Sequence, residues 1–238
     1  MLDRSRGTIL GVMNARQVHR RRQEAARARQ AARRRRRLAV AAVLAVVLVA
    51  VIGGLAVSAA ARHQQSAASP GPLAGLQTGP APWGANTADL AQRLQAIGLP
   101  PLSPMEGTVV HIHQHLDLYV DGRKVTVPAG IGIDAAVGYA PLHTHDPSGV
   151  IHVESPTART YTLGEFFAVW GVRLTPSCLG GDCAAGGRQL RVYVNGRADH
   201  GDPASLVLAA HQELVVAIGT AAQLPSPVPS SYRFPPGL

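Results

Sequence analysis

Residues 108–133 read TVVHIHQHLDLYVDGRKVTVPAGIGI. Apolar and polar residues alternate through this stretch, which is typical of a β-strand with one buried face. The pair Asp121-Gly122 favours the positive φ angles of a two-residue turn, so it predicts a β-hairpin. Residues 188–219 repeat the scheme around Asn195-Gly196. The similar segments LYVDGR and VYVNGR fit either an internal duplication or turn chemistry common to two unrelated hairpins.

Between the hairpins, the sequence predicts one more strand and one helix. GVIHVES (149–155) has the pattern of a short strand, and TLGEFFAVWGVRL (162–174) that of an amphipathic helix. Thr162 and Glu165 have the spacing of a capping box at the start of this helix. A second, shorter helix is predicted within NTADLAQRLQAIGLP (86–100), with Asn86 or Thr87 as its N-cap and Gly98 as its end.

All of the net positive charge lies at the N-terminus. Residues 1–37 hold 13 arginines and two acidic residues, whereas the other 201 residues hold 10 basic and 12 acidic ones. This pattern predicts a disordered basic tail that sets membrane topology. The alternative is an arm that binds nucleic acid or anionic lipid, and the lack of an accompanying aromatic or folded scaffold disfavours it.

Residues 38–61 are uncharged over 24 positions. As a helix they would span about 36 Å, enough to cross a bilayer, so we expect a transmembrane segment with lipid as its partner. A cleaved signal peptide is the alternative, because VSAAA resembles a cleavage site, but the apolar run exceeds the usual signal length. The flanking arginines predict a cytoplasmic N-terminus at the plasma membrane and an extracytoplasmic C-terminal part.

The predicted fold class is therefore α+β: an N-terminal transmembrane helix followed by a small β-rich extracytoplasmic domain with hairpins and one or two packed helices. The domain is large enough for one hydrophobic core. Five parts are expected: a basic tail (1–37), the span (38–61), a Pro/Gly/Ala-rich linker with the short helix (62–104), the His-rich domain (105–221) and a Pro-rich tail (222–238).

Histidines gather in this domain at alternate positions. Side chains two residues apart on a strand project from the same face, and three separate segments carry such pairs of histidines or of histidine and glutamate. If these segments are neighbours in one sheet, four or more ligand groups converge, which favours a metal site. The predicted ligands are His143, His145, His152 and Glu154 as first choice, with His111, His113 and His115 next.

The ligand types narrow the choice of metal. Neutral imidazole with carboxylate suits Zn²⁺, Cu²⁺, Ni²⁺ or Fe²⁺, whereas Cu⁺ sites usually add thioether or thiolate groups. The methionines are Met1, Met13 and Met105 alone, which disfavours a Met-lined Cu⁺ site. We therefore expect Cu²⁺ or Zn²⁺. A structural hydrogen-bond network of the same histidines is the alternative.

Cys178 and Cys183 have four residues between them. Outside the cytoplasm such a pair favours a short structural disulfide, and thiolate ligation or a redox switch is the alternative.

The histidine spacing does not match known catalytic motifs. HTHD lacks the later histidine of metallo-β-lactamase-like hydrolases, and the sequence has no zincin H-E-x-x-H motif and no G-x-S-x-G nucleophile turn. The sequence thus favours a binding protein over an enzyme.

The segments HIHQHLDLYVDG, VPAGIGI, LHTHDPSGVIHVESP and TLGEFFAVWG together resemble an uncharacterised family of membrane-anchored, extracytoplasmic His-rich proteins of actinobacteria and other prokaryotes. The resemblance covers roughly residues 105–220. It implies a small recurring extracytoplasmic domain and assigns no activity to it.

From the residues we expect an extracytoplasmic Cu²⁺ or Zn²⁺ protein for storage, delivery or assembly, whose partner is an envelope metalloprotein or membrane complex. Two alternatives stay open: a metal-dependent envelope enzyme, hydrolytic or redox, and a metal-free structural or interaction module of a membrane complex.

Overall fold

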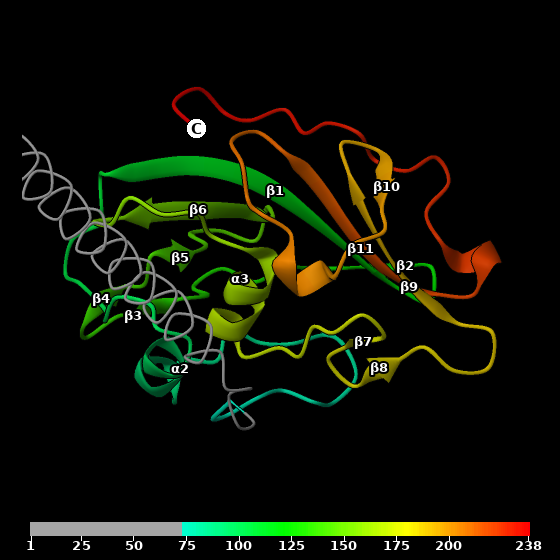
Figure 1. Ribbon diagram of the computed structural model, residues 1–238, viewed down its shortest axis with the longest axis horizontal. Helices are drawn as coiled ribbons and strands as arrows, with labels where there is room; N and C mark the ends of the chain where they lie inside the picture. The colour runs from blue at the N-terminus through cyan, green and yellow to red at the C-terminus, as the bar shows by residue number, and fades with distance from the viewer. Residues whose placement is uncertain (1–72) are drawn as a thin grey trace, which may run out of the picture. The chain divides into compact units, whose positions relative to one another are not determined.

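The computed structural model describes residues 73–238. The predicted basic tail, the predicted span 38–61 and the first part of the predicted linker lie outside the described residues. Within residues 73–238, no helix has the length and apolar character needed to cross a membrane. The described part of the chain is an α+β domain, rich in β-strands and with two α-helices (Figure 1).

The long strand β1 (Val110–Val120) is the centre of a seven-stranded sheet. It pairs in parallel with β11, and all other neighbours in the sheet are antiparallel. The strand order is β10 (Arg197–Asp199), β9 (Gln189–Val194), β11 (Glu213–Gly219), β1, β6 (Val150–Ser155) and β5 (Leu142–His143), with β2 (Arg123–Val125) also paired to β1.

Both predicted hairpins are confirmed. β1 and β2 are joined at Asp121-Gly122, with φ angles of 49° and 80°. β9 and β10 are joined at Asn195-Gly196, with φ angles of 51° and 77°. Positive φ at both turn positions is the geometry that asparagine, aspartate and glycine tolerate best.

Smaller elements complete the domain. β3 (Ile133–Asp134) pairs with β4 (Gly138–Tyr139), and β7 (Cys178–Leu179) pairs with β8 (Asp182–Cys183). The β7–β8 pair carries the predicted disulfide between Cys178 and Cys183, so both sulfur atoms are bonded to each other. Two 3₁₀ turns, η1 (Pro203–Ser205) and η2 (Ala221–Gln223), flank β11.

Helix α3 (Leu163–Trp170) has the predicted capping box. The Thr162 hydroxyl accepts from the Glu165 backbone N–H at 3.2 Å, and the Glu165 carboxylate accepts from the Thr162 N–H at 2.9 Å. The helix ends before the predicted Leu174, because Gly171 adopts the left-handed conformation.

Helix α2 (Leu90–Ala96) begins later than predicted, with Asp89 at the N-cap position. The expected caps Asn86 and Thr87 were wrong for this reason. The Asn86 side chain instead accepts from the Ala88 N–H and donates to the Gly75 carbonyl, in a turn that precedes the helix.

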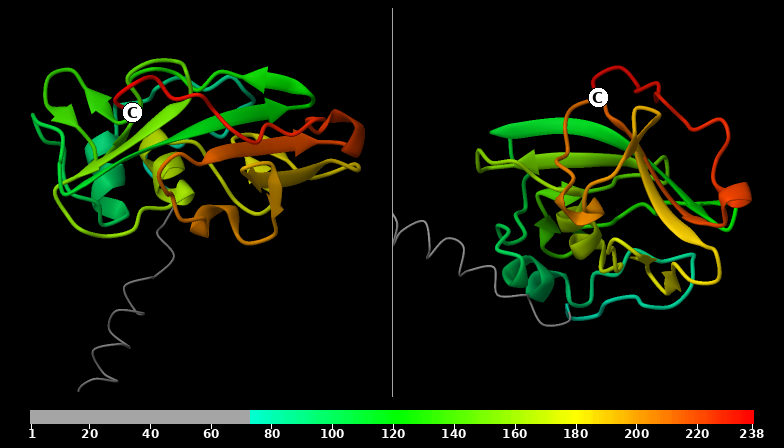
Figure 2. Two further views of the ribbon diagram at one scale, coloured as in Figure 1. Left: turned by 90° about the horizontal axis from the view of Figure 1, so that it is seen from above. Right: turned by 45° about the vertical axis from the view of Figure 1, so that its right-hand side comes forward.

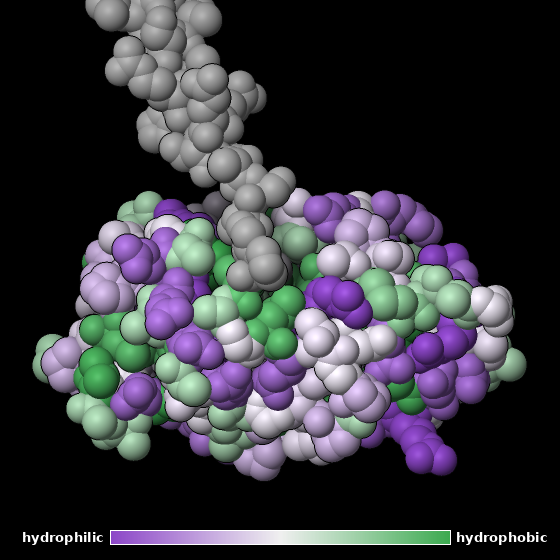
Figure 3. Space-filling view, turned by 90° about the horizontal axis from the view of Figure 1, so that it is seen from below, coloured by the Kyte–Doolittle hydropathy of each residue, from purple (hydrophilic) through white to green (hydrophobic). Residues whose placement is uncertain are grey.

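The two helices cover one face of the sheet, α3 against β5 and α2 against α3 (Figure 1). Their apolar side chains form the core with Ile151 and Val153 of β6 and with Leu116 and Leu118 of β1. The segment expected as a linker contributes Trp83, Leu90 and Leu94 to this core. Seen from below, polar and apolar residues are interspersed over the described surface (Figure 3).

The C-terminal segment lies on the opposite face of the sheet (Figure 2). The Tyr232 ring stacks on His115 with 3.8 Å between ring centroids and an interplanar angle of 5°. Phe234 lies against His211 at 4.9 Å. The sheet is therefore covered on both sides, which buries polar residues of β1 that simple alternation would leave exposed.

Arg93 is a fully buried cation in the helical layer. Its guanidinium donates to the carbonyl oxygens of Val169 at the end of α3, of Ala74 and of Asn86. Burial lowers the pKa of Arg93, with Asp89 acting in the opposite direction. One side chain thus ties α2, α3 and the segment before α2 together.

We expect Arg93→Ala to lower the free energy of unfolding by roughly 2–4 kcal/mol, because buried carbonyl groups lose charged donors. The exposed neighbour Gln92 is the matched control. Its alanine variant should stay within about 0.5 kcal/mol of the wild type in urea denaturation. Equal losses of unfolding free energy in the Arg93 and Gln92 variants would contradict the stabilising role of the Arg93 hydrogen bonds.

Candidate metal centre

The register of three strands brings the histidine pairs together. His113 of β1 lies opposite His152 of β6, and His152 lies opposite His143 of β5. His111 lies opposite Glu154 in the same ladder. Since directly opposite side chains project from the same face, imidazoles from three strands form a row across the sheet. The predicted convergence is confirmed.

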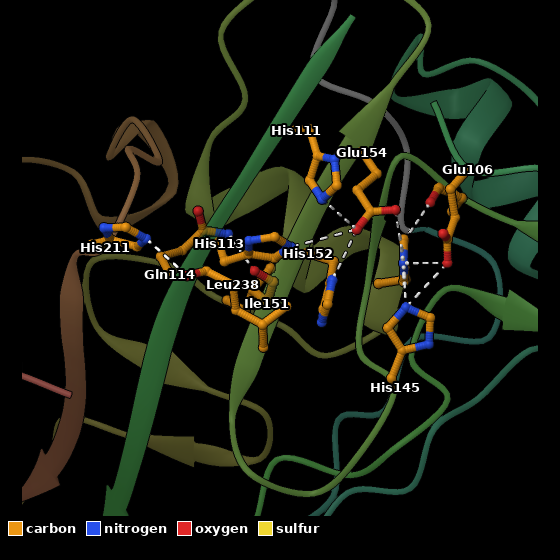
Figure 4. Close-up of polar contacts among 12 residues, drawn as sticks. Glu106, His111, His113, Gln114, His145, Ile151, His152, Glu154, His211 and Leu238 are labelled. Atoms are coloured by element: carbon orange, nitrogen blue, oxygen red, sulfur yellow. Dashed lines mark hydrogen bonds and ion pairs between the residues drawn. The ribbon is translucent and has the colours of Figure 1, made fainter. Parts of the chain in front are cut away.

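The Glu154 carboxylate lies at the middle of this row (Figure 4). Its Oε1 atom is 3.3 Å from His111 Nε2 and 3.5 Å from His113 Nε2. It also accepts a hydrogen bond of 3.0 Å from His152 Nδ1. The other oxygen, Oε2, is 4.0 Å from His143 Nε2. Four imidazoles therefore surround one buried carboxylate.

A second carboxylate, that of Glu106, lies on the side of the cluster formed by His143 and His145. Glu106 Oε1 is 3.2 Å from His145 Nε2 and 3.7 Å from His143 Nε2. The two Nε2 atoms of His143 and His145 are 3.1 Å apart. Glu106 was not predicted, because it lies in the loop before β1 and has no i, i+2 relation to a histidine.

Gly107 explains how this loop reaches the site. A Cβ atom at Gly107 would lie 2.1 Å from the carbonyl carbon of Ser155, at the end of β6. Only glycine permits so close an approach of two backbones. The approach places Glu106 beside the strand that carries His152 and Glu154.

Hydrogen bonding fixes the tautomer of His143. Its Nδ1–H donates to the Ala140 carbonyl at 3.0 Å, which leaves Nε2 with its lone pair facing the cluster. His145 Nε2–H therefore donates to His143 Nε2 at 3.1 Å. Burial lowers the pKa of His143 to about 4. The imidazole is therefore neutral at ordinary pH, which is the form that binds metal ions.

Burial also lowers the pKa of His113 and of His152, with the neighbouring histidines acting in the same direction and Glu154 in the opposite one. Burial by itself would raise the pKa of Glu154, but the hydrogen bond from His152 and the nearby histidines lower it overall. His113, His143 and His152 are accordingly neutral beside an ionised Glu154 carboxylate.

Several groups of the described residues could thus hold a metal ion. Each member of such a group offers one ligand atom, and these atoms lie within 4.8 Å of one another. One group comprises four residues and the second shares its glutamate. The members are His143, His145, His152 and Glu154 for the first, and His111, His113 and Glu154 for the second.

His115 lies in a different group, with Asp117 and Glu213. Its Nδ1 donates to Glu213 Oε2 at 2.7 Å, and its Nε2 donates to the Ser148 carbonyl at 2.9 Å. Lys124 lies 2.6 Å from Asp117. Hydrogen bonds occupy both ring nitrogens of His115, which separates it from the Glu154 cluster.

A cavity of about 380 Å³ adjoins the side of the cluster formed by His111 and His113. Its walls include His111, His113, His211 and Leu238. His211 itself donates from Nε2 to the Leu238 carbonyl at 3.2 Å. Neither His211 nor His200 belongs to any of the three groups found among the described residues.

Comparison of the chain with protein-family models, with curated proteins and with solved structures gives no match. The resemblance to membrane-anchored His-rich proteins therefore stays a prediction, and the interpretation of the site depends on its own geometry.

The buried neutral His143 predicts a stability that falls in acid. In the unfolded chain a histidine has a pKa near 6.5, so between pH 6.5 and 4 the unfolded state binds more protons than the folded state. For the metal-free protein we expect the free energy of unfolding to fall between pH 7.5 and 5.0, with about 2 kcal/mol of that loss due to His143.

Urea titrations at the two pH values, in the presence of a chelator, measure this loss. His143→Gln should show a pH-dependent loss smaller by about 2 kcal/mol, whatever its stability at pH 7.5. If the variant and the wild type lose the same free energy on acidification, His143 is not the buried neutral group described above.

Proposed function

We propose that this chain is a membrane-anchored extracytoplasmic protein that binds a transition metal, Cu²⁺ or Zn²⁺, for storage, delivery or assembly of a partner. The observation that carries the proposal is the Glu154 carboxylate, which has three imidazole nitrogens within 3.5 Å of one oxygen and a fourth within 4.0 Å of the other.

The donor set supports a borderline cation. Imidazole nitrogen with one or two carboxylates is the ligand combination of Zn²⁺ and Cu²⁺ sites, whereas Mg²⁺ and Ca²⁺ prefer oxygen atoms alone. The disulfide Cys178–Cys183 leaves no free cysteine thiol to bind Cu⁺ in residues 73–238.

The second coordination shell supports the same proposal. A histidine that ligates a metal commonly donates its other ring N–H to a backbone carbonyl or a carboxylate, which orients the ring. His143 donates to the Ala140 carbonyl, which is outside the proposed ligand set. This proposed ligand is thus oriented before any metal binds.

The location rests on the sequence. The uncharged run 38–61 and the arginines before it are the reasons to place residues 73–238 outside the plasma membrane. The disulfide fits an oxidising compartment. An envelope metalloprotein or a membrane complex is the proposed recipient of the metal.

The cavity beside His111 and His113 favours a second candidate function, a metal-dependent envelope enzyme, hydrolytic or redox. A catalytic metal needs an open coordination position that substrate or water can reach. A cavity of about 380 Å³ is large enough for a small molecule. Hydrolytic and redox assays of the metal-loaded protein would separate this candidate from a carrier.

We expect the purified full chain in detergent to bind Cu²⁺ or Zn²⁺ with near-stoichiometric occupancy, measured by elemental analysis after dialysis and by calorimetry. His143→Asn/His145→Asn should lose most of this metal, because two facing ring nitrogens are removed. His200→Asn/His211→Asn is the matched control and should keep it, since neither histidine belongs to the cluster.

Circular dichroism of each variant checks that it is folded, and the exposed residue His145 provides a single variant with little effect on the core. A wild type that binds both ions more weakly than about 100 μM, roughly −5.5 kcal/mol, would contradict the proposal. It would favour the metal-free interaction module instead.

A further inference from the structure

We infer that the centre holds two metal ions per chain, bridged by the carboxylate of Glu154. The inference rests on the proposed function, since it concerns the number and arrangement of the ions at that site. It goes beyond metal binding because it assigns the two oxygens of one carboxylate to two different ions.

The first argument is the number of ligand groups. Five histidines and two glutamates surround the site, whereas Zn²⁺ commonly takes four protein or water ligands and other first-row ions up to six. One ion would leave several of these groups without a role. The groups are His111, His113, His143, His145, His152, Glu106 and Glu154.

The second argument is how the groups divide around Glu154. Oε1 faces the imidazoles that come from β1 and accepts a hydrogen bond from His152 Nδ1, while Oε2 faces His143 on the other side. Figure 4 shows the carboxylate between His111 and His113 on one side and His145 and Glu106 on the other. Each side has at least two imidazoles of its own, which is enough to hold an ion together with one carboxylate oxygen.

The third argument is a ring nitrogen without a hydrogen-bond partner in the group of His111, His113 and Glu154, which is called the outer group here. His113 is buried, with a side chain about 6% exposed, and its Nε2 atom has no hydrogen-bond partner within the described part of the chain. Buried polar atoms in native proteins nearly always have a partner. This nitrogen faces Glu154 Oε1 at 3.5 Å, so a cation bound between them would supply the missing contact.

The two ions would differ in accessibility. The inner position lies beside His143, whose side chain is fully buried, whereas His111 is about half exposed and lines the cavity with His113. We therefore expect the outer ion to exchange faster with a chelator than the inner one.

The test uses the full chain in detergent, stripped with a chelator and titrated with Cu²⁺. Elemental analysis counts the bound copper, and electron paramagnetic resonance counts the uncoupled spins. For the wild type we expect two copper ions per chain, an integrated signal well below two spins, and a half-field transition, because a bridged pair of Cu²⁺ ions is magnetically coupled.

His111→Asn should bind one copper ion instead of two, with a full one-spin signal and no half-field transition. This side chain is half exposed, so the variant tests the outer position with little risk to the fold. Glu154→Gln should lose the magnetic coupling, since an amide does not bridge two ions as a carboxylate does. His200→Asn is the control and should keep the coupled pair.

The outcomes separate this inference from the proposed function. One copper ion in the wild type, unchanged in His111→Asn, overturns the two-ion centre and leaves metal binding intact. Two uncoupled ions, or coupling that persists in Glu154→Gln, overturns the bridge. A wild type that binds no copper at the cluster overturns both.

Discussion

The pairing register of β1 with β6 is the constraint on which the site depends. It places His113 opposite His152 and His111 opposite Glu154, and β5 extends the row with His143. A shift of one residue in this register would turn the histidines of one strand to the opposite face. The apolar residues of the other face prevent such a shift, because Ile151 and Val153 would then leave the core. The hydrophobic core therefore fixes the site, although the two lie on opposite faces of the sheet.

Covering both faces has an electrostatic consequence. The helices bury one face, while the C-terminal segment and the loop around Gly107 cover parts of the other. Removal from water disfavours the charged form of an imidazole and lowers the pKa of His113, His143 and His152, so these three side chains stay neutral at the pH where a free histidine begins to protonate. The same burial would penalise Glu154, and hydrogen bonding from His152 offsets that penalty.

Features that depend on neighbouring residues in the chain could be predicted from the sequence. Asp121-Gly122, Asn195-Gly196 and the Thr162–Glu165 capping box act within a few residues, and the i, i+2 spacing of the histidines depends only on the strand period. Glu106 could not be found this way, because its position follows from a close contact between Gly107 and Ser155. The separation of His115 from the cluster was equally hidden, since it follows from the parallel pairing of His115 with Glu213, 98 residues away.

A metal site and a structural hydrogen-bond network require different partners for the buried ring nitrogens of the histidines. A structural network stabilises a protein only if every buried member has a partner, since an unpaired polar atom costs about 1–3 kcal/mol. His115 meets that demand with both ring nitrogens bonded. His113 does not meet it, because its Nε2 faces a carboxylate at 3.5 Å without a hydrogen bond. A cation between nitrogen and carboxylate would satisfy both groups and would also balance the charge of Glu154 among neutral imidazoles. The contrast concerns the ring nitrogens of these two histidines, because Glu213 beside His115 also keeps one buried oxygen without a partner in residues 73–238. The unpaired ring nitrogen of His113 is the physical reason to favour a metal ion at Glu154 over a closed hydrogen-bond network.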